Sequence, residues 1–158
     1  MLNNEHINKG DMIELRSFTN ADIEQLQKYE HDIKSPADWE KLIETWNEKK
    51  YNDSYFEMYA VLKNGNIIGK ASLYQRSEHI VSCGMEIYSE FRGNSFATNA
   101  YQILLSVAKQ KGFTIAVAQV LADNSASIAL HKKAGFESED YAYTNKKGNL
   151  VYLFIKIL

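Results

Sequence analysis

Residues 92–98, with the sequence Arg-Gly-Asn-Ser-Phe-Ala-Thr, have the composition of an anion-binding turn at the beginning of a helix. A helix that begins directly after a tight turn leaves its first backbone N–H groups without intrahelical partners, and its dipole adds partial positive charge there. Arg92 supplies a permanent cation, and Gly93 lets the backbone come close to a ligand. The segment therefore predicts a phosphate site, and the alternative is an ordinary turn with a surface arginine.

A second stretch, residues 124–136, places polar side chains on a short helix. Asn124 is suited to cap this helix, and Gly135 and Phe136 end it as the residues of a Schellman motif do. His131 lies near the end of the helix, and imidazole has an ordinary pKa of about 6.5, so it can act as a proton donor. A surface histidine stabilised there by the helix dipole is the other interpretation.

Together the two stretches resemble the motifs of one family. Residues 92–97 are similar to the (Arg/Gln)-x-x-Gly-x-(Gly/Ala) pyrophosphate loop of the GNAT superfamily of acetyl-CoA-dependent N-acetyltransferases. Residues 124–136 resemble that family's Asn-x-x-(Ala/Ser)-x-x-Leu-Tyr-x-Lys-x-Gly-Phe helix. The resemblance implies an α/β (α+β) fold with a mixed central sheet of about seven strands and about four helices. It also implies that the fourth and fifth strands, residues 79–87 and 114–120, splay apart around acetyl-CoA.

The resemblance further implies a set of residues that bind the coenzyme through backbone amides and nearby side chains. Each hydrogen bond to a charged group contributes about 1.5–3 kcal/mol, so a few amides can hold a pyrophosphate. This coenzyme set comprises Ile87, Tyr88, Arg92, Gly93, Asn94, Ser95, Phe96, Ala97, Thr98, Asn124, Ser127 and Lys133. Ser95 replaces the usual second glycine, and Ser89 replaces a common proline. A serine in left-handed backbone costs about 1–2 kcal/mol, so we expect weakened coenzyme binding but no loss of it.

Direct attack of an amine on the thioester requires a proton acceptor, because a lysine-like amine is less than about one part in a thousand neutral at pH 7. The family's glutamate positions correspond here to Val81 and Gln119, and neither accepts a proton. The resemblance places Glu86 near the thioester as the candidate base, whereas an exposed strand residue is the alternative. His131 stands where many relatives carry a tyrosine and is the candidate acid for the departing thiolate. Water-mediated proton transfer is also open, with the acceptors Glu78, His79, Tyr141 and Tyr143.

The elements that position these residues follow from the periodicity of apolar side chains. Strands are expected at residues 13–18, 55–62, 67–74, 79–87, 114–120, 136–143 and 150–157. Helices are expected to run from a cap at residues 19–22 through Tyr29, from Pro36 through Trp46, over residues 97–111, and from a cap at residues 123–125 through Lys133. Asn64-Gly65 predicts a tight hairpin, and the strand–helix–strand order over residues 79–120 predicts a right-handed parallel crossover.

Length and composition limit the classes of protein that remain. The 158 residues fit a single domain, 1–158, in which residues 1–10 are expected to form a flexible N-terminal extension. A net charge of −2 without basic stripes argues against a nucleic-acid partner. No apolar run is long enough to cross a bilayer and no secretion signal is recognisable, so we expect no membrane partner and a cytoplasmic location. Scattered histidines and the single Cys83 give no metal-binding spacing, so no metal is expected.

The acceptor is less constrained by the sequence. In the family, the segment that corresponds to residues 20–50 forms one wall of the acceptor pocket, and its many acidic residues here favour a cationic amine or simply a solvated surface. Trp39 and Trp46 either line that pocket or pack in the core. We predict an enzyme, an N-acetyltransferase that moves an acetyl group from acetyl-CoA to a primary amine of a small molecule, peptide or protein, as a monomer or homodimer. A non-catalytic, GNAT-like acyl-CoA-binding regulatory module, and transfer of a longer acyl group or to an oxygen acceptor, are the alternatives.

Overall fold

The computed structural model describes residues 11–33 and 35–158, so the extension expected at residues 1–10 lies outside the described residues. The helices in this part of the chain are α1 (Ile23–Tyr29), α2 (Pro36–Asn47), α3 (Phe96–Gln110) and α4 (Ser125–Lys133). The longer strands are β1 (Ile13–Ser17), β3 (Ser54–Lys63), β4 (Asn66–Gln75), β5 (Ile80–Ile87), β6 (Ile115–Leu121) and β9 (Leu150–Ile157). The short elements are β2 (Lys50–Tyr51), β7 (Glu137–Ser138), β8 (Tyr143–Thr144) and 3-10 turns at Asn20–Asp22 and Ser89–Phe91.

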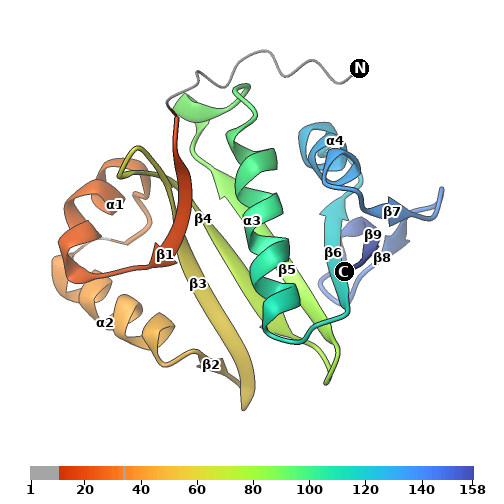
Figure 1. Ribbon diagram of the computed structural model, residues 1–158, viewed down its shortest axis with the longest axis horizontal. Helices are drawn as coiled ribbons and strands as arrows, with labels where there is room; N and C mark the ends of the chain where they lie inside the picture. Colours follow the sequence, from red (N-terminus) through yellow and green to blue (C-terminus); the bar gives the residue numbers. More distant parts are fainter. Residues whose placement is uncertain (1–10, 34) are drawn as a thin grey trace.

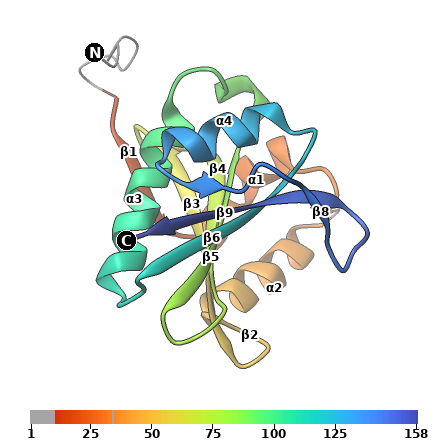
Figure 2. The same cartoon turned by 90° about the vertical axis from the view of Figure 1, so that its right-hand side faces the viewer.

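The strands form one mixed sheet in the order β1-β3-β4-β5-β6-β9-β7, with β2 paired to β3 and β8 to β9. Among the strands of residues 11–33 and 35–158, only β5 and β6 are paired in parallel, and α3 connects them, as the crossover predicted from the sequence requires. α3 lies on one side of the sheet, and α1 and α2 lie on the other (Figures 1 and 2). The predicted α/β architecture with a mixed sheet is therefore confirmed. None of the helices in the described ranges is long and apolar enough to cross a membrane.

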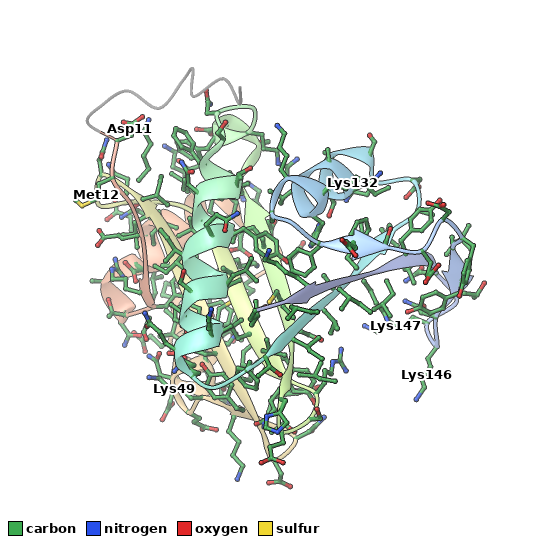
Figure 3. All side chains as sticks on the ribbon, turned by 45° about the vertical axis from the view of Figure 1, so that its right-hand side comes forward. Asp11, Met12, Lys49, Lys132, Lys146 and Lys147 are labelled. Atoms are coloured by element: carbon green, nitrogen blue, oxygen red, sulfur yellow. The ribbon has the colours of Figure 1, made fainter. Side chains whose placement is uncertain are left out.

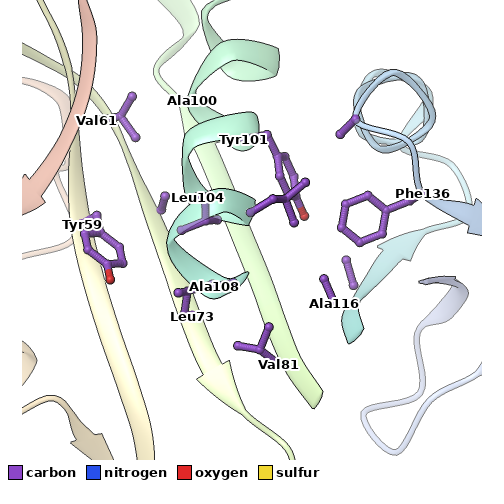
Figure 4. Close-up of a cluster of buried hydrophobic side chains, with 14 of the residues drawn as sticks. Tyr59, Val61, Leu73, Val81, Ala100, Tyr101, Leu104, Ala108, Ala116 and Phe136 are labelled. Atoms are coloured by element: carbon purple, nitrogen blue, oxygen red, sulfur yellow. The ribbon is translucent and has the colours of Figure 1, made fainter. Parts of the chain in front are cut away.

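Two apolar clusters attach the helices to the sheet. On the α3 side, Figure 4 shows side chains of α3 against those of β3, β4 and β5, including Ala100, Leu104 and Ala108 with Val61, Leu73 and Val81. On the other side, α1 and α2 bury a second cluster that includes Phe18, Leu26, Trp39, Ile43 and Leu62. Trp39 is fully buried and Trp46 packs against Phe18, which supports the core interpretation of both tryptophans.

The local signals that end the elements are formed as the sequence predicts. Asn64 and Gly65 both have positive φ in the turn between β3 and β4, as a type I′ hairpin requires. At the beginning of α4, the Asn124 side chain accepts a hydrogen bond from the Ser127 N–H at 3.0 Å. At its end, Phe136 N–H donates to the His131 carbonyl at 3.0 Å, which is the long bond of a Schellman motif.

The prediction of one continuous strand over residues 136–143 is wrong. Only Glu137–Ser138 and Tyr143–Thr144 are strands, and each pairs with a different part of β9. The sequence between them contains Glu139 and Asp140, which have low strand propensity, and Tyr141 is 67% exposed instead of packed on the sheet. β8 leads into a turn that carries Lys146 and Lys147 at the edge of the molecule (Figure 3).

A buried carboxylate, Glu57, holds together the part of the molecule around the C-terminal end of α3. It accepts hydrogen bonds from the hydroxyls of Tyr55 and Tyr59, and the ammonium groups of Lys49 and Lys111 lie 3.3 and 3.4 Å from its oxygens. Burial alone would raise the pKa of Glu57, but these partners hold its pKa below the ordinary value. This cluster lies at the opposite end of α3 from residues 92–98.

Candidate functional site

β5 and β6 separate after only three paired positions. Residues 80, 81 and 82 pair in that order with residues 115, 116 and 117, and no later residue of β5 pairs with β6. The remaining five residues of β5 and four of β6 therefore diverge, which confirms the splay predicted between the fourth and fifth expected strands. Parallel strands normally exchange hydrogen bonds along their whole length, so the splay leaves backbone polar groups on the facing edges without ladder partners.

A cavity of about 380 Å³ lies beside the end of β5, between the loop that follows it and α4. Of the residues expected to bind coenzyme or act in catalysis, the cavity is lined by Glu86, Ile87, Arg92, Gly93, Asn94, Ser95, Phe96, Ala97, Asn124 and Ser127. Tyr88, Thr98, Lys133 and His131 are not among its lining residues. Leu130, the leucine of the family's helix motif, also lines the cavity. Three further apolar lining residues, Met85, Phe91 and Ala126, had no signal in the sequence beyond their proximity to the motifs.

The loop between β5 and α3 presents a row of unused backbone donors. The N–H groups of residues 93–98 donate to no acceptor within the part of the chain that the structure describes, and the first helical bond runs from Asn99 N–H to the Ser95 carbonyl at 3.1 Å. All of these residues except Thr98 line the cavity. Free amides at the beginning of a helix, together with the helix dipole, form a site for an anion such as a phosphate.

Arg92 closes the loop that carries these donors. Its Nε–H donates to the Ile87 carbonyl at 2.8 Å, which fixes the side chain along the cavity wall and leaves the other guanidinium N–H groups available. Gly93 has a φ of +82° and Ser95 a φ of +60°. Ser95, which replaces the family's glycine, therefore does adopt left-handed backbone. This conformation costs about 1–2 kcal/mol for serine.

Substitutions at Ser95 test this backbone requirement. Ser95→Gly is expected to change the free energy of unfolding by less than about 1 kcal/mol, because relief of the left-handed strain is offset by the greater backbone entropy of glycine in the unfolded chain. Ser95→Val is expected to lower it by about 1–3 kcal/mol, since a β-branched residue is a strong outlier at positive φ. Urea unfolding of the three proteins measures the difference, and equal stabilities of the two variants would contradict the backbone argument.

His131 lies inside the protein and not on the helix surface. The residue is 6% exposed, and its ring packs against Tyr101, Phe136 and Phe154. The Tyr101 and Phe136 rings, which meet edge-on, are drawn in Figure 4. The His131 Nδ1 lies 2.7 Å from the Ser127 carbonyl, which can only accept, so Nδ1 carries the proton. Nε2 is then the acceptor for the Tyr101 hydroxyl at 3.0 Å. Burial lowers the pKa of His131, which keeps this neutral form.

Glu86 is the carboxylate that the structure places at the cavity. Its side chain is 49% exposed, and its Oε2 lies 3.5 Å from the ammonium of Lys70, its cross-strand neighbour on β4. Gly69 explains the close approach of the strands here, because a Cβ at this position would lie 2.0 Å from the Glu86 carbonyl oxygen. An isolated glycine inside a strand pattern is a recognisable signal for such close approach, although sequence reasoning missed it.

The alternative proton acceptors lie elsewhere. Glu78 and His79 precede β5, at the end of that strand opposite Glu86 and about 25 Å away along the chain direction. Tyr141 and Tyr143 line a different cavity, of about 600 Å³, against β9. Val81 is fully buried, as is consistent with a core position. Burial raises the pKa of the Cys83 thiol to about 12, so it is no activated nucleophile.

Comparison with known proteins decides the family. A family model described as an acetyltransferase (GNAT) domain matches residues 6–137. The chain belongs to this GNAT family. As an acetyltransferase of the GNAT family it is an acyltransferase enzyme, as the sequence predicts. No curated protein matches the chain significantly in sequence.

Solved structures of acetyltransferases share the fold of this GNAT protein. A ribosomal L7/L12 alpha-N-protein acetyltransferase in complex with coenzyme A superimposes with a TM-score of 0.80 at 16% identity, over 98% of each chain. An aminoglycoside acetyltransferase in complex with coenzyme A and kanamycin gives 0.72 at 18% identity, over 92% of this chain and 95% of that one. An acetyltransferase from Salmonella typhimurium that modifies the N-terminal serine of L7/L12 gives 0.75 at 17% identity, over the same shares. These identities establish a common fold and leave the acceptor of this GNAT protein open.

Proposed function

We propose that this protein is an acetyl-CoA-dependent N-acetyltransferase that acetylates a primary amine of a small molecule, peptide or protein. The observation that carries the proposal is the cavity beside splayed β5, in which unused backbone amides and Arg92 stand at one side and Glu86 at another. The amides and the guanidinium suit the pyrophosphate of the coenzyme. The edge of β5 that β6 leaves unpaired suits the peptide-like pantetheine arm, which directs the thioester toward Glu86.

The fit to the coenzyme depends mainly on backbone groups. Each amide that donates to a phosphate oxygen contributes about 1.5–3 kcal/mol, so several of them outweigh the cost of about 1–2 kcal/mol at Ser95. Asn124 and Ser127, at the beginning of α4, line the same cavity and offer further polar groups. Lys133 and Thr98 are exposed or partly exposed outside the lining, so we propose for them no more than peripheral contacts with the coenzyme.

In the proposed reaction the neutral amine attacks the thioester carbonyl, a C–N bond forms, and the C–S bond breaks with release of the coenzyme thiol. The amine proton passes to Glu86, directly or through water. His131 is the candidate acid on the thiolate side, but it lies outside the cavity lining and its one ring proton is held on the Ser127 carbonyl, so a proton from it has to pass through another group. A thiol pKa near 8.5 makes the thiolate an adequate leaving group, so we expect the base to matter more than the acid. No group of three or more His, Cys, Asp or Glu side chains that could hold a metal ion is found among residues 11–33 and 35–158.

Two measurements on the wild-type protein test the proposal. Titration calorimetry with acetyl-CoA measures binding, and release of free thiol is followed against a panel of amines that includes polyamines, aminoglycosides, amino acids and peptide N-termini. We expect saturable binding and thiol release with at least one amine class. Binding without release for every amine would favour the non-catalytic acyl-CoA-binding module, and a folded protein that binds no acetyl-CoA would reject both functions.

A further inference from the structure

Lys70 lies between two carboxylates, Glu30 and Glu86, and Glu86 lines the cavity. Its ammonium hydrogen-bonds Glu30, which directly follows α1, and lies 3.5 Å from Glu86 on β5. The second oxygen of Glu30 accepts a hydrogen bond from the Tyr88 hydroxyl at 2.6 Å, and the Tyr88 ring stacks on Tyr29 with centroids 4.7 Å apart. The side chains of Glu30, Lys70 and Glu86 thus connect the end of α1 to β4 and β5, and Glu86 is the one of the three that lines the cavity.

The two contacts of Lys70 are unequal. The Lys70 and Glu30 side chains are 24% and 17% exposed and directly hydrogen-bonded, whereas Glu86 is 49% exposed and at a longer distance. A shielded, hydrogen-bonded ion pair is stronger than a solvated pair at longer range. Lys70 therefore interacts more strongly with Glu30 than with Glu86. The Glu86 carboxylate remains available to interact with a reacting amine or another cation.

We propose that Lys70 is a positioning residue, which holds the Glu86 carboxylate toward the reacting amine while Glu30 and Tyr88 hold Lys70 itself. The inference rests on the proposed function, because it concerns the base of that reaction. Two carboxylates, Glu30 and Glu86, and the ammonium of Lys70 leave the cluster with one negative charge. This balance favours an acceptor that arrives as a protonated primary amine over a neutral one.

The test separates positioning from simple charge. Lys70→Met removes a cation. If Lys70 acted only through its charge, the KM for a cationic acceptor would be unchanged or lower and kcat would stay the same. Loss of positioning predicts a kcat about tenfold lower. We expect both effects together, with acetyl-CoA affinity within about twofold of wild type. Lys70→Arg keeps a cation and should restore kcat to within about threefold. Lys109→Met, at an exposed position on α3, is the matched control and should match wild type.

Glu30→Gln provides a second variant in case Lys70→Met fails to fold. It releases Lys70 to pair with Glu86, so we expect kcat/KM for a cationic amine to fall by about tenfold. Wild-type kcat in Lys70→Met, or loss of activity in Lys70→Arg equal to that in Lys70→Met, would overturn the positioning role. Absence of thiol release from the wild-type protein with every amine would instead reject the proposed function, with the positioning role rejected along with it.

Discussion

Glu86→Gln is expected to lower kcat/KM for acetyl transfer to a lysine-like amine by about 100-fold, the lower end of the range for loss of a general base. Glutamine keeps the shape and polarity of the side chain but cannot accept the proton that the ammonium must lose. Acetyl-CoA affinity should change by less than about threefold, because the coenzyme is expected to contact the backbone of β5 and not this side chain. Thiol release and titration calorimetry measure the two quantities separately.

The pKa of the acceptor sharpens this prediction. An α-amino group with a pKa near 8 is neutral about two hundred times more often at pH 7 than a lysine-like amine, so its need for a base is smaller. The loss in Glu86→Gln should therefore be smaller for a peptide N-terminus than for a side-chain amine. Glu14→Gln, on the exposed side of β1, is the matched control. A rate unchanged by Glu86→Gln for both amine classes would remove Glu86 from the reaction.

The fold could be predicted because its signals are local and mutually consistent. Asn64-Gly65 determines a hairpin, Asn124 determines the beginning of α4, and the apolar face of residues 97–111 determines α3. Once β5, α3 and β6 are recognised, handedness leaves one way to place them. Residues 136–143 were predicted wrongly because aromatic residues in a short run suggest a strand, whereas intervening acidic residues favour a loop.

The site could be predicted only where its chemistry lies in consecutive residues. The loop of residues 92–97 is continuous in sequence and lines the cavity as a unit. The surroundings of Glu86 come from three separate elements, and Glu30 and Lys70 are 56 and 16 residues distant in sequence, so no spacing indicated them. The burial of His131 likewise depends on its contact with Tyr101 of α3. In the sequence, Tyr101 has the pattern of an ordinary core residue and does not indicate this contact.

His131→Phe is expected to lower kcat by about tenfold while acetyl-CoA affinity changes by less than about threefold. The loss is modest because a thiolate of pKa near 8.5 leaves without much assistance. His131 Nε2 is bonded to the Tyr101 hydroxyl, so the two side chains form one hydrogen-bonded unit. Tyr101→Phe and the double variant should therefore show the same kcat as His131→Phe within about twofold. Wild-type kcat in His131→Phe would remove His131 as an acid, and wild-type kcat in Tyr101→Phe alone would show that the two side chains do not act as one unit.

The same variant reports the ionisation state of His131 through stability. Burial lowers its pKa in the folded protein, whereas in the unfolded chain the pKa is about 6.5. As pH falls below about 6.5 the unfolded chain gains a proton that the folded protein does not, so the free energy of unfolding decreases. His131→Phe lacks this contribution, and its own loss of the Tyr101 partner, about 1–3 kcal/mol, does not vary with pH. The difference in stability between wild type and variant should therefore shrink from pH 7 to pH 5 in urea unfolding, and a constant difference would show that His131 ionises normally inside the fold.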